Sequence, residues 1–359
     1  MPTSIRTYDP SYKQSFIDLN TAWLNEFFAV EEHDRQVFSN IEEVIIRPGG
    51  EIFFCLSDDV VVGTVAMQKL SDDVYELAKM AVAKPYRGRG FSNELMSACL
   101  EFARARKAAK VVLLSNTRMV PAIRLYRKSG FVEVPLGETD YAWADIQMEL
   151  SLVDESPWDQ IPLADYEAHM SNEQVGQLRL LSQLTETYLD LLRPGSAIFL
   201  GIAGGNGLEH IDNAITRSVI GIDISQNYLA EVFRRYGDRI PGLRLLKLDV
   251  SRTPDTIIRG DMIWAGLVLE YIGIDATLTF ARNNLRPGGN LVATIQSNNG
   301  ITAVSPTGVT SVQRAAGICQ TVEEDELTRR FLDGGFTRKG REENFLPNGK
   351  SFKTFVFSR

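Results

Sequence analysis

Two glycine-containing turns carry the residues best suited to chemistry, and the first of them is Arg87-Gly88-Arg89-Gly90. It follows the strand-like run KMAVAK and precedes a helix-like stretch. Glycines allow several backbone N–H groups to point toward one place, and the start of a helix adds the positive end of its dipole. The two arginines add charge nearby. The loop therefore predicts a pyrophosphate site, although an ordinary turn can contain the same residues.

The second turn lies in AIFLGIAGGNGLEHI, where an apolar run leads into glycines and then into a helix start. Its spaced positions are Gly201, Ala203, Gly205 and Gly207. Small residues are needed at such positions if a bulky nucleoside is to approach the backbone closely. A tight turn without a ligand is the alternative interpretation.

Two carboxylates follow this second turn at the ends of the next apolar runs. Asp223 ends VIGID, where an acidic residue can accept hydrogen bonds from both hydroxyls of a ribose. Asp249, followed by Val250, ends LLKLD, where a carboxylate can accept from an adenine amino group. Because the carboxyl ends of parallel strands meet at one edge of a sheet, we expect the turn and both carboxylates to form one nucleoside site.

The overall composition limits the classes of protein to consider. The 359 residues suffice for two ordinary domains, and 44% hydrophobic with 23% charged residues is typical of a soluble globular chain. The start, MPTSIRTYDP, lacks a secretory signal, and no apolar run approaches the roughly 20 residues that span a bilayer, so we expect a cytoplasmic protein without membrane contact. A net charge of −8 argues against a nucleic-acid partner. The oligomeric state is left open.

Metal chemistry is not indicated by the cysteines and histidines. The three cysteines contain no CxxC pair, and the three histidines are not placed at metal-ligand spacing: Cys55, Cys99, Cys319, His33, His169 and His210. We therefore predict no metal site. Separately, we expect small molecules as the substrates.

A boundary between two domains falls near 151–162, where SLVDESPWDQIP contains two prolines that favour an extended chain. We predict a first domain over 1–152, a linker over 153–164 and a second domain over 165–359. The first domain begins with an amphipathic helix over 10–28, continues with antiparallel strands, and then alternates strand, loop, helix, strand, helix and strand. This order indicates an α+β fold with a mixed sheet.

The second domain alternates in a different way. Apolar runs are separated by helical or turn-rich segments, and they read AIFLGIA, VIGIDIS, LRLLKLDV, DMIWAGLVL and NLVATIQ. This alternation indicates an α/β fold with a doubly wound, mostly parallel sheet. Polar and apolar residues then alternate on both sides of Asn348-Gly349, which predicts a terminal antiparallel hairpin.

The stretch from Ile5 to Leu150 resembles the GNAT acetyltransferase superfamily. Arg87 and Gly90 match its cofactor motif R/Q-x-x-G-x-G/A, with Ser92 in place of the last small residue. ELAKMAV is similar to the strand before that motif, and SNTRMVPAIRLYRKSGF to the later motif on the cofactor side. The resemblance implies a GNAT-like mixed sheet with acetyl-CoA as the cofactor.

By this resemblance, backbone groups of Met80 and Val82 would bind the pantetheine arm. Loop 87–92, which includes Phe91, would hold the pyrophosphate. Asn116 would bond to the cofactor arm, and its alternative role is to cap the turn that follows.

The same resemblance implies two catalytic groups. Tyr126 would protonate the leaving thiolate, with a packing tyrosine on a helix as the alternative. Glu76 would remove a proton from the attacking amine, with a solvent-facing strand carboxylate as the alternative. Glu76 and Met80 are an even number of residues apart, so strand alternation places both toward the same cleft.

Residues 160–359 resemble the class I S-adenosylmethionine-dependent methyltransferase superfamily, including the turn-and-strand LRPGGNLV before the final helix and hairpin. The glycine pattern is not the G-x-G-x-x-G of dinucleotide sites. The usual first motif is acidic-x-G-x-G-x-G, and here Gly201 stands at the acidic position and Ala203 at the first glycine position. The resemblance implies a Rossmann-like sheet with S-adenosyl-L-methionine as the cofactor.

Two pairs of residues are candidates for the substrate side of this second site. The segment DYEAHMSNEQVGQL resembles a helix that closes over the cofactor, which puts Tyr166 and His169 near the substrate. Glu270 and Tyr271 follow the fourth strand, where substrate contacts commonly arise. A surface histidine and a glutamate at a helix start are the alternatives.

These observations favour a bifunctional transferase that uses acetyl-CoA and S-adenosylmethionine. A second interpretation makes the first domain a non-catalytic acyl-CoA sensor that regulates the methyltransferase. A third makes the second domain a binder of an adenosyl ligand without catalysis. The presence of both Tyr126 and Glu76 favours an active first domain.

Overall fold

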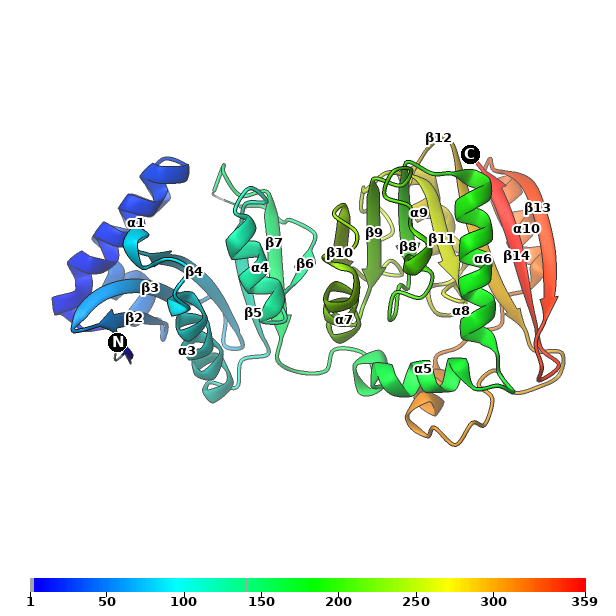
Figure 1. Ribbon diagram of the computed structural model, residues 1–359, viewed down its shortest axis with the longest axis horizontal. Helices are drawn as coiled ribbons and strands as arrows, with labels where there is room; N and C mark the ends of the chain where they lie inside the picture. Colours follow the sequence, from blue (N-terminus) through cyan, green and yellow to red (C-terminus); the bar gives the residue numbers. More distant parts are fainter. Residues whose placement is uncertain (1–2, 140) are drawn as a thin grey trace. The chain divides into compact units, whose positions relative to one another are not determined.

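The computed structural model describes residues 3–139 and 141–359, and these divide into two compact units (Figure 1). The first unit ends at Val153, and the second comprises Asp154–Arg359. Each unit has strands flanked by helices and a hydrophobic core of its own.

The first unit has a mixed sheet. Its strands follow the order β1-β2-β3-β4-β5-β7-β6, and among the described residues only β4 and β5 pair in parallel. The elements are β1 (Thr3–Arg6), η1 (Pro10–Tyr12), α1 (Lys13–Phe27), α2 (Glu32–Ser39), η2 (Glu42–Ile46), β2 (Glu51–Ser57), β3 (Val60–Lys69), β4 (Val74–Val82), η3 (Lys84–Tyr86), α3 (Phe91–Ala105), β5 (Lys110–Ser115), α4 (Val120–Lys128), β6 (Val132–Val134) and β7 (Ile146–Ser151). The predicted mixed sheet is confirmed, and β1 and α2 are elements that the sequence analysis missed.

Strand β2 shows why helices cover both faces of this sheet. Its side chains are apolar on both sides, so each face must be buried. Ile52 and Phe54 pack with Phe16 of α1 in one cluster. Phe53 and Cys55 pack with α3 in another cluster. The strands are therefore held between α1 and α2 on one face and α3 and α4 on the other.

The second unit has parallel strands followed by an antiparallel hairpin. Its strands follow the order β10-β9-β8-β11-β12-β14-β13, in which β10 to β12 are parallel and β14 runs antiparallel to both of its neighbours. The elements are η4 (Pro157–Gln160), α5 (Leu163–Ser171), α6 (Gln177–Leu192), β8 (Ser196–Leu200), η5 (Leu208–His210), β9 (Ser218–Asp223), α7 (Gln226–Tyr236), β10 (Leu243–Lys247), β11 (Gly260–Gly266), α8 (Leu269–Ile272), α9 (Ile274–Asn284), β12 (Leu285–Ser297), η6 (Ser311–Gly317), α10 (Glu324–Asp333), β13 (Thr337–Phe345) and β14 (Ser351–Ser358).

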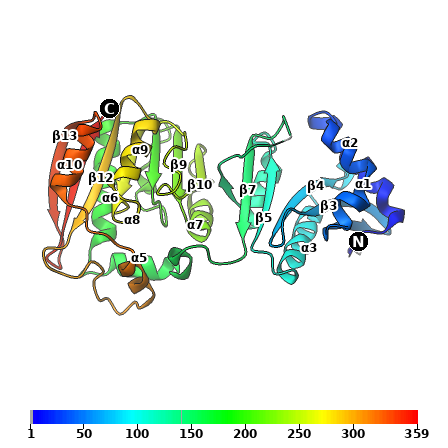
Figure 2. The same ribbon diagram turned by 180° about the vertical axis from the view of Figure 1, so that it is seen from behind.

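Helices cover both faces of this sheet as well. Ile198 of β8 packs in a cluster with Phe280 of α9 and Phe331 of α10, and those two helices lie in front in Figure 2. Helix α6 covers the opposite face and lies in front in Figure 1, where Tyr188 packs against Trp264 of β11 with ring centroids 6.4 Å apart. The parallel sheet, its helical layers and its terminal hairpin are therefore present as the sequence predicts.

The segment predicted as an extended linker, 153–164, has a different structure. Pro157 begins a helical turn, because its fixed φ suits the first position of a helix and the missing N–H costs nothing there. Ile161 is buried within the second unit, and Pro162 directly precedes α5. Of the helices described in the structure, none combines the length and apolar character needed to cross a bilayer.

Candidate active sites

The first candidate site lies where β4 and β5 separate. Among the described residues, pairing between these parallel strands is confined to Val74–Glu76 and Lys110–Val112, so the rest of β4 has an open edge on this side. The N–H of Ala83 donates to the carbonyl of Val62 on the other side. Because backbone groups alternate along a strand, the N–H and C=O of Val82 face the open edge. The N–H of Val82 can therefore donate to a ligand arm there, whereas its C=O already accepts from Arg87, and a bond from Val82 to a cofactor arm stays a prediction.

Loop 87–92 connects this open edge to α3. Gly88 and Gly90 have φ values of 77° and 91°, which only glycine adopts without strain, and a methyl group added at either would meet no atom within 4 Å. Within the described part of the chain, the N–H groups of residues 88–92 donate to no other residue. Free N–H groups at the start of a fifteen-residue helix form a site for an anion.

The polar side chains around the loop already have partners. The guanidinium of Arg87 forms a bidentate pair with Glu26 at 3.0 and 3.1 Å, and its Nε donates to the carbonyl of Val82 at 3.0 Å. Arg89 lies over the ring of Tyr86. The anion site therefore consists of backbone N–H groups, with the charge of Arg87 largely offset by Glu26.

Asn116 follows β5 and is buried. Its Nδ2 donates to the carbonyl of Trp143 at 2.5 Å, and its Oδ1 accepts from the N–H of Arg118 at 3.0 Å. These contacts fit the turn-capping alternative, and a bond from Asn116 to a cofactor arm stays a prediction.

A pocket adjoins the open edge of β4 and includes Glu76 and Met80 in its lining. This lining agrees with the prediction that Glu76 and Met80 face the same cleft, although strict alternation is not the reason, because β4 carries a bulge. Ala78 pairs with Ala66 and Ala81 with Thr64, which leaves one extra residue on β4. Burial raises the pKa of Glu76, although the ammonium of Lys79 partly lowers it, so this carboxylate is a stronger base than one in water.

Lys79 is a functional candidate that the sequence analysis missed. It sits at the bulge with a φ of 55°, and its ammonium bonds to Asp34 of α2 and to the hydroxyl of Tyr141, the latter at 2.9 Å. Both Lys79 and Tyr141 line the pocket with Glu76. A lysine in the run LAKMAV, whose other residues are apolar, was the signal in the sequence.

Tyr126 lies on α4 and is not among the residues that line this pocket. Its ring is buried in the cluster that holds Cys99, and burial followed by the nearby Cys99 raises the pKa of Tyr126 to about 12. The hydroxyl therefore stays protonated at neutral pH, which a proton donor requires. Whether it meets a cofactor sulfur stays a prediction.

The second candidate site is a cavity at the carboxyl ends of the parallel strands. Leu200, Asp223, Leu248 and Gly266 line it from the ends of β8, β9, β10 and β11. Strand β8 pairs with β9 on one side and β11 on the other, so the chain changes direction at this point of the sheet. Ligands of doubly wound sheets bind at such a switch point.

Asp223 is held in place by the glycine turn. Its Oδ2 accepts from the N–H of Ala203 at 2.9 Å, and its Oδ1 accepts from the N–H of Ser225 at 3.0 Å. Burial raises the pKa of Asp223 to about 6, against the opposing effect of these hydrogen bonds. Each oxygen keeps a free lone pair, so the carboxylate can still accept from a pair of ligand hydroxyls.

The glycine turn mainly allows a ligand to approach the backbone closely, and free N–H donors are a smaller part of its contribution. All four spaced positions have left-handed φ values: 64° at Gly201, 45° at Ala203, 83° at Gly205 and 93° at Gly207. Gly201 and Ala203 line the cavity, whereas a methyl group at Gly205 or Gly207 would strike Tyr236 or Thr185. The last two glycines therefore serve packing. Ala203 holds a backbone conformation that favours glycine.

Asp249 does not line the cavity. Its Oδ1 accepts from the N–H and hydroxyl of Ser251, and Arg252 lies 3.2 Å from Oδ2. Leu248 and Val250, on either side, do line it. The structure thus offers apolar contacts where an adenine was expected, and a bond from Asp249 stays a prediction.

Two segments distant in sequence, 157–171 and 303–319, cover this cavity, and we call them the roof segments. Trp158 packs edge-on against Tyr166 and Tyr271, with ring centroids 6.0 and 5.0 Å apart. Ser311 joins the two segments by donating to Asp165 at 2.6 Å. The second segment, with its turn η6, is a part of the site that periodicity did not reveal.

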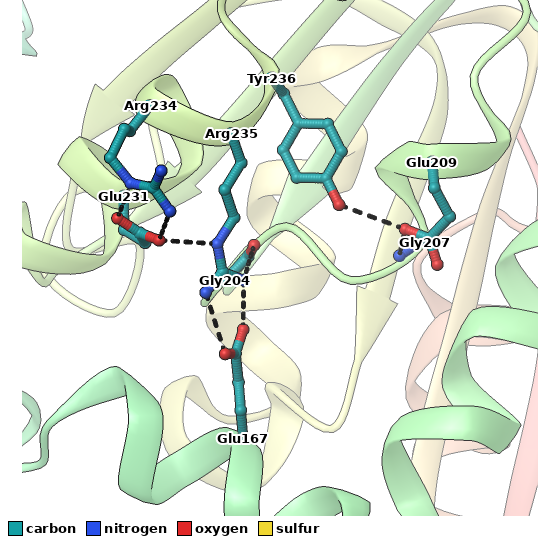
Figure 3. Close-up of polar contacts among 8 residues, drawn as sticks. All are labelled: Glu167, Gly204, Gly207, Glu209, Glu231, Arg234, Arg235 and Tyr236. Carbon is teal, nitrogen blue, oxygen red and sulfur yellow. Dashed lines mark hydrogen bonds and ion pairs between the residues drawn. The ribbon is translucent and has the colours of Figure 1, made fainter.

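Helix α5 in the first roof segment is tied to the glycine turn by an ion-pair network (Figure 3). Arg235 of α7 forms a bidentate pair with Glu167 and donates to the carbonyl of Gly204 at 3.2 Å. Glu231 holds the other side of Arg235 at 2.8 Å. Glu209 accepts from the N–H of Gly207, so it supports the turn instead of facing the cavity.

The predicted substrate residues Tyr166, His169, Glu270 and Tyr271 all line the cavity. His169 is buried, and its Nδ1 lies 2.8 Å from the hydroxyl of Thr307. Burial, followed by the charge of Lys350, lowers the pKa of His169, so its ring is neutral at pH 7. Over residues 3–139 and 141–359 we find no cluster of ligating side chains for a metal ion.

Comparison with known proteins bears on the first unit. Residues 17–131 match the model of the acetyltransferase (GNAT) family. N-acetylaspartate synthetases from Danio rerio and Homo sapiens are each 35% identical, over 104 and 95 residues, which is 28% and 26% of this chain and 36% and 32% of theirs. The chain therefore spans about a third of the length of the curated relatives it matches. Mycothiol acetyltransferase from Corynebacterium glutamicum is 30% identical over 81 residues, 23% of this chain and 28% of its own.

Solved structures were also compared. A GNAT-family acetyltransferase from Staphylococcus aureus is 20% identical with a TM-score of 0.40, covering 42% of this chain and all of that one. An acetyltransferase from Streptococcus agalactiae is 22% identical with a TM-score of 0.38, covering 42% and 98%. From the family match over the segment that contains β4, loop 87–92 and β5, we conclude that residues 17–131 form a GNAT acetyltransferase domain.

Proposed function

We propose that this chain is a bifunctional transferase: its first unit is an acetyl-CoA-dependent N-acetyltransferase and its second an S-adenosylmethionine-dependent methyltransferase, both acting on small metabolites. The observation that carries the first half is the set of free N–H groups at residues 88–92, beside the open edge of β4. The family match over residues 17–131 supports the same assignment.

In the acetyl transfer, acetyl-CoA supplies an acyl group activated as a thioester. Glu76 would take the proton of the attacking amine, which its raised pKa favours. Tyr126 would give a proton to the departing sulfur and regain one from water. The backbone of Val82 would hold the pantetheine arm so that the thioester lies over the pocket.

The acceptor amine would bind in the pocket that Glu76, Lys79 and Tyr141 line. The curated relatives include N-acetylaspartate synthetases, whose name indicates an amino acid as acceptor. Here the Lys79 ammonium is bonded to Asp34, so a strongly acidic acceptor would have to compete for it. We therefore propose a small amine-bearing metabolite without committing to an acidic one.

Gly90→Ala tests the pyrophosphate site. The added methyl has open space around it in the protein, so it would occupy room that the phosphate needs. We expect acetyl-CoA affinity to fall at least tenfold. Gly49→Ala is the matched control, because Gly49 lies in the same unit, has a φ of 103° and offers only ordinary contacts to a methyl group. Equal acetyl-CoA affinity of the two variants would refute the placement.

The methyltransferase half rests on the cavity at the switch point with Asp223 at its edge. The terminal hairpin supports it, because an antiparallel β14 beside β12 departs from the all-parallel order of dinucleotide-binding sheets. S-adenosylmethionine would supply a methyl group already activated on a sulfonium. Asp223 would receive its ribose hydroxyls, and Leu248 and Val250 would pack against its adenine.

Titration of the intact chain with S-adenosylmethionine and, separately, with NAD tests this half. We expect binding of the first and none of the second at matched concentrations. Tight binding of NAD, or no binding of S-adenosylmethionine, would refute the assignment. A further assay incubates the chain with acetyl-CoA and a panel of amines and uses mass spectrometry to detect acetylated products. Such products would show that the first unit is an active acetyltransferase and not a non-catalytic sensor.

A further inference from the structure

Glu270 stands out because one of its carboxyl oxygens has no partner. The side chain is 5% exposed, and its Oε1 accepts from the N–H of Gln296 at 2.8 Å. Its Oε2 is buried and forms no hydrogen bond within the described part of the chain. A buried acceptor without a partner destabilises the fold, and more so if it is charged. Glu270 lines the cavity, so a ligand bound there can supply the missing donor.

The charges around the cavity favour a cationic ligand. Among the described residues that line it, Asp223 and Glu270 are carboxylates, and none is lysine or arginine. His169 is neutral at pH 7 and bonded to Thr307. The buried ammonium of Lys350 donates to the carbonyl of Ala303 at 2.7 Å and is not part of the lining. An anionic acceptor would meet two like charges of the protein, with no lysine or arginine among the described lining residues to offset them.

Aromatic rings complete this environment. Trp158 contacts Tyr166 and Tyr271 edge-on, and Tyr166 lies 6.2 Å from Tyr228 between ring centroids. All four rings line the same cavity as Glu270. Aromatic faces attract an ammonium most strongly where water is excluded. A carboxylate together with several aromatic faces is therefore suited to an amine.

We propose that the methyl acceptor of the second unit is an amine whose N–H is received by Oε2 of Glu270, with the rings of Trp158 and Tyr271 around it. This inference rests on the proposed methyltransferase function and narrows it to one substrate class. Glu270 first takes one proton from the bound ammonium, which leaves an electron pair on the nitrogen. That pair forms the bond to the methyl carbon while the bond from carbon to sulfur breaks, and the electron pair of the broken bond stays on sulfur as a thioether. The product leaves as an N-methylammonium, and Glu270 returns its proton to water.

The protonation behaviour of Glu270 agrees with this role. Burial raises the pKa of Glu270 to about 7, against the opposing effect of the hydrogen bond from Gln296. Near neutral pH the carboxylate can therefore accept a proton during the reaction and release it afterwards.

The test uses the full chain saturated with S-adenosylhomocysteine and calorimetric titration with isosteric pairs: 2-phenylethylamine against 2-phenylethanol, and butylamine against butanol. We expect at least one amine to bind ten or more times tighter than its alcohol. In Glu270→Gln the preference should fall below threefold. Glu173→Gln is the control, because it removes the same charge at an exposed position.

Two results would overturn the proposal: amines and alcohols binding alike in the unaltered protein, or an amine preference that survives Glu270→Gln. The first comparison uses the unaltered protein, so the proposal can be refuted even if the Glu270→Gln variant does not fold. If S-adenosylhomocysteine itself does not bind, the proposed methyltransferase function fails. If it binds and the amine preference is missing, only the acceptor assignment fails.

Discussion

Replacing Asp223 by asparagine should weaken S-adenosylmethionine binding more than any other single isosteric change in the cavity. In the structure, the carboxylate accepts one backbone N–H on each oxygen, from Ala203 at 2.9 Å and from Ser225 at 3.0 Å. An amide has a single acceptor oxygen, so one of these N–H groups would face an NH₂ group. The remaining oxygen would also lose the charge that strengthens its bonds to ribose hydroxyls.

The magnitude follows from the lost charge-assisted bond. A hydrogen bond to a charged group contributes about 1.5–3 kcal/mol, which corresponds to a dissociation constant raised about 10- to 150-fold. Calorimetry at pH 8, where a group with a pKa of about 6 is ionised, measures this change. Asp212→Asn is the matched control, because the Asp212 carboxylate also accepts an N–H two residues on, at 2.8 Å, but on an exposed loop. A folded Asp223→Asn protein that binds within threefold of the unaltered chain would refute the reasoning.

Three further changes test other parts of the account. Tyr126→Phe should lower acetyl turnover about 10- to 100-fold, since it removes a proton donor, while the acetyl-CoA dissociation constant stays within twofold; unchanged turnover would remove the role. Glu270→Gln should nearly match the unaltered protein in stability at pH 4, below the unfolded pKa of the glutamate. At pH 8 it should be about 1–3 kcal/mol more stable, because a raised acid pKa means that stability is lost as pH rises from 4.5 to about 7; thermal unfolding at both pH values decides this. Ala203→Gly should stabilise the chain by about 0.5–1 kcal/mol in urea unfolding, because alanine is strained at a φ of 45°, and a loss of stability would contradict that explanation.

The elements of the fold were predictable where local pattern and burial agree. Strand β8 is apolar on both faces, so its sequence alone indicates a strand covered on both sides, and the structure confirms this. The hairpin around Asn348-Gly349 is equally local, with Gly349 at a φ of 85°. Short or polar elements such as β1 and α2 were missed, because their tertiary contacts decide their structure.

The candidate sites were less predictable in their side chains. Backbone features such as loop 87–92 follow from glycine and helix position, which the sequence displays. The bulge at Lys79 and its contact with Asp34 depend on pairing between β3, β4 and α2, which no periodicity shows. Likewise, the partners of Asn116 and Asp249 are backbone and side-chain groups that only the folded turns bring close.

The roof segments illustrate the same limit. The prolines at 157 and 162 suggested an extended linker, yet Pro157 holds the first position of a helical turn, where proline is favoured, and Pro162 directly precedes α5. Ser311 and Asp165 form a hydrogen bond although they are 146 residues apart, so no local sequence pattern indicates that the two segments meet. Both segments contribute to the lining of the cavity, so its shape depends on this long-range contact.

Titration of the intact chain with acetyl-CoA and with S-adenosylmethionine, each in the presence of a saturating amount of the other, addresses the central claim most directly. Two distinct sites predict that each ligand binds in about a 1:1 ratio whether or not the other is present. They also predict that Gly90→Ala impairs only acetyl-CoA binding and Asp223→Asn only S-adenosylmethionine binding. Mutual exclusion of the ligands, or one variant abolishing both bindings while still folded, would contradict the account.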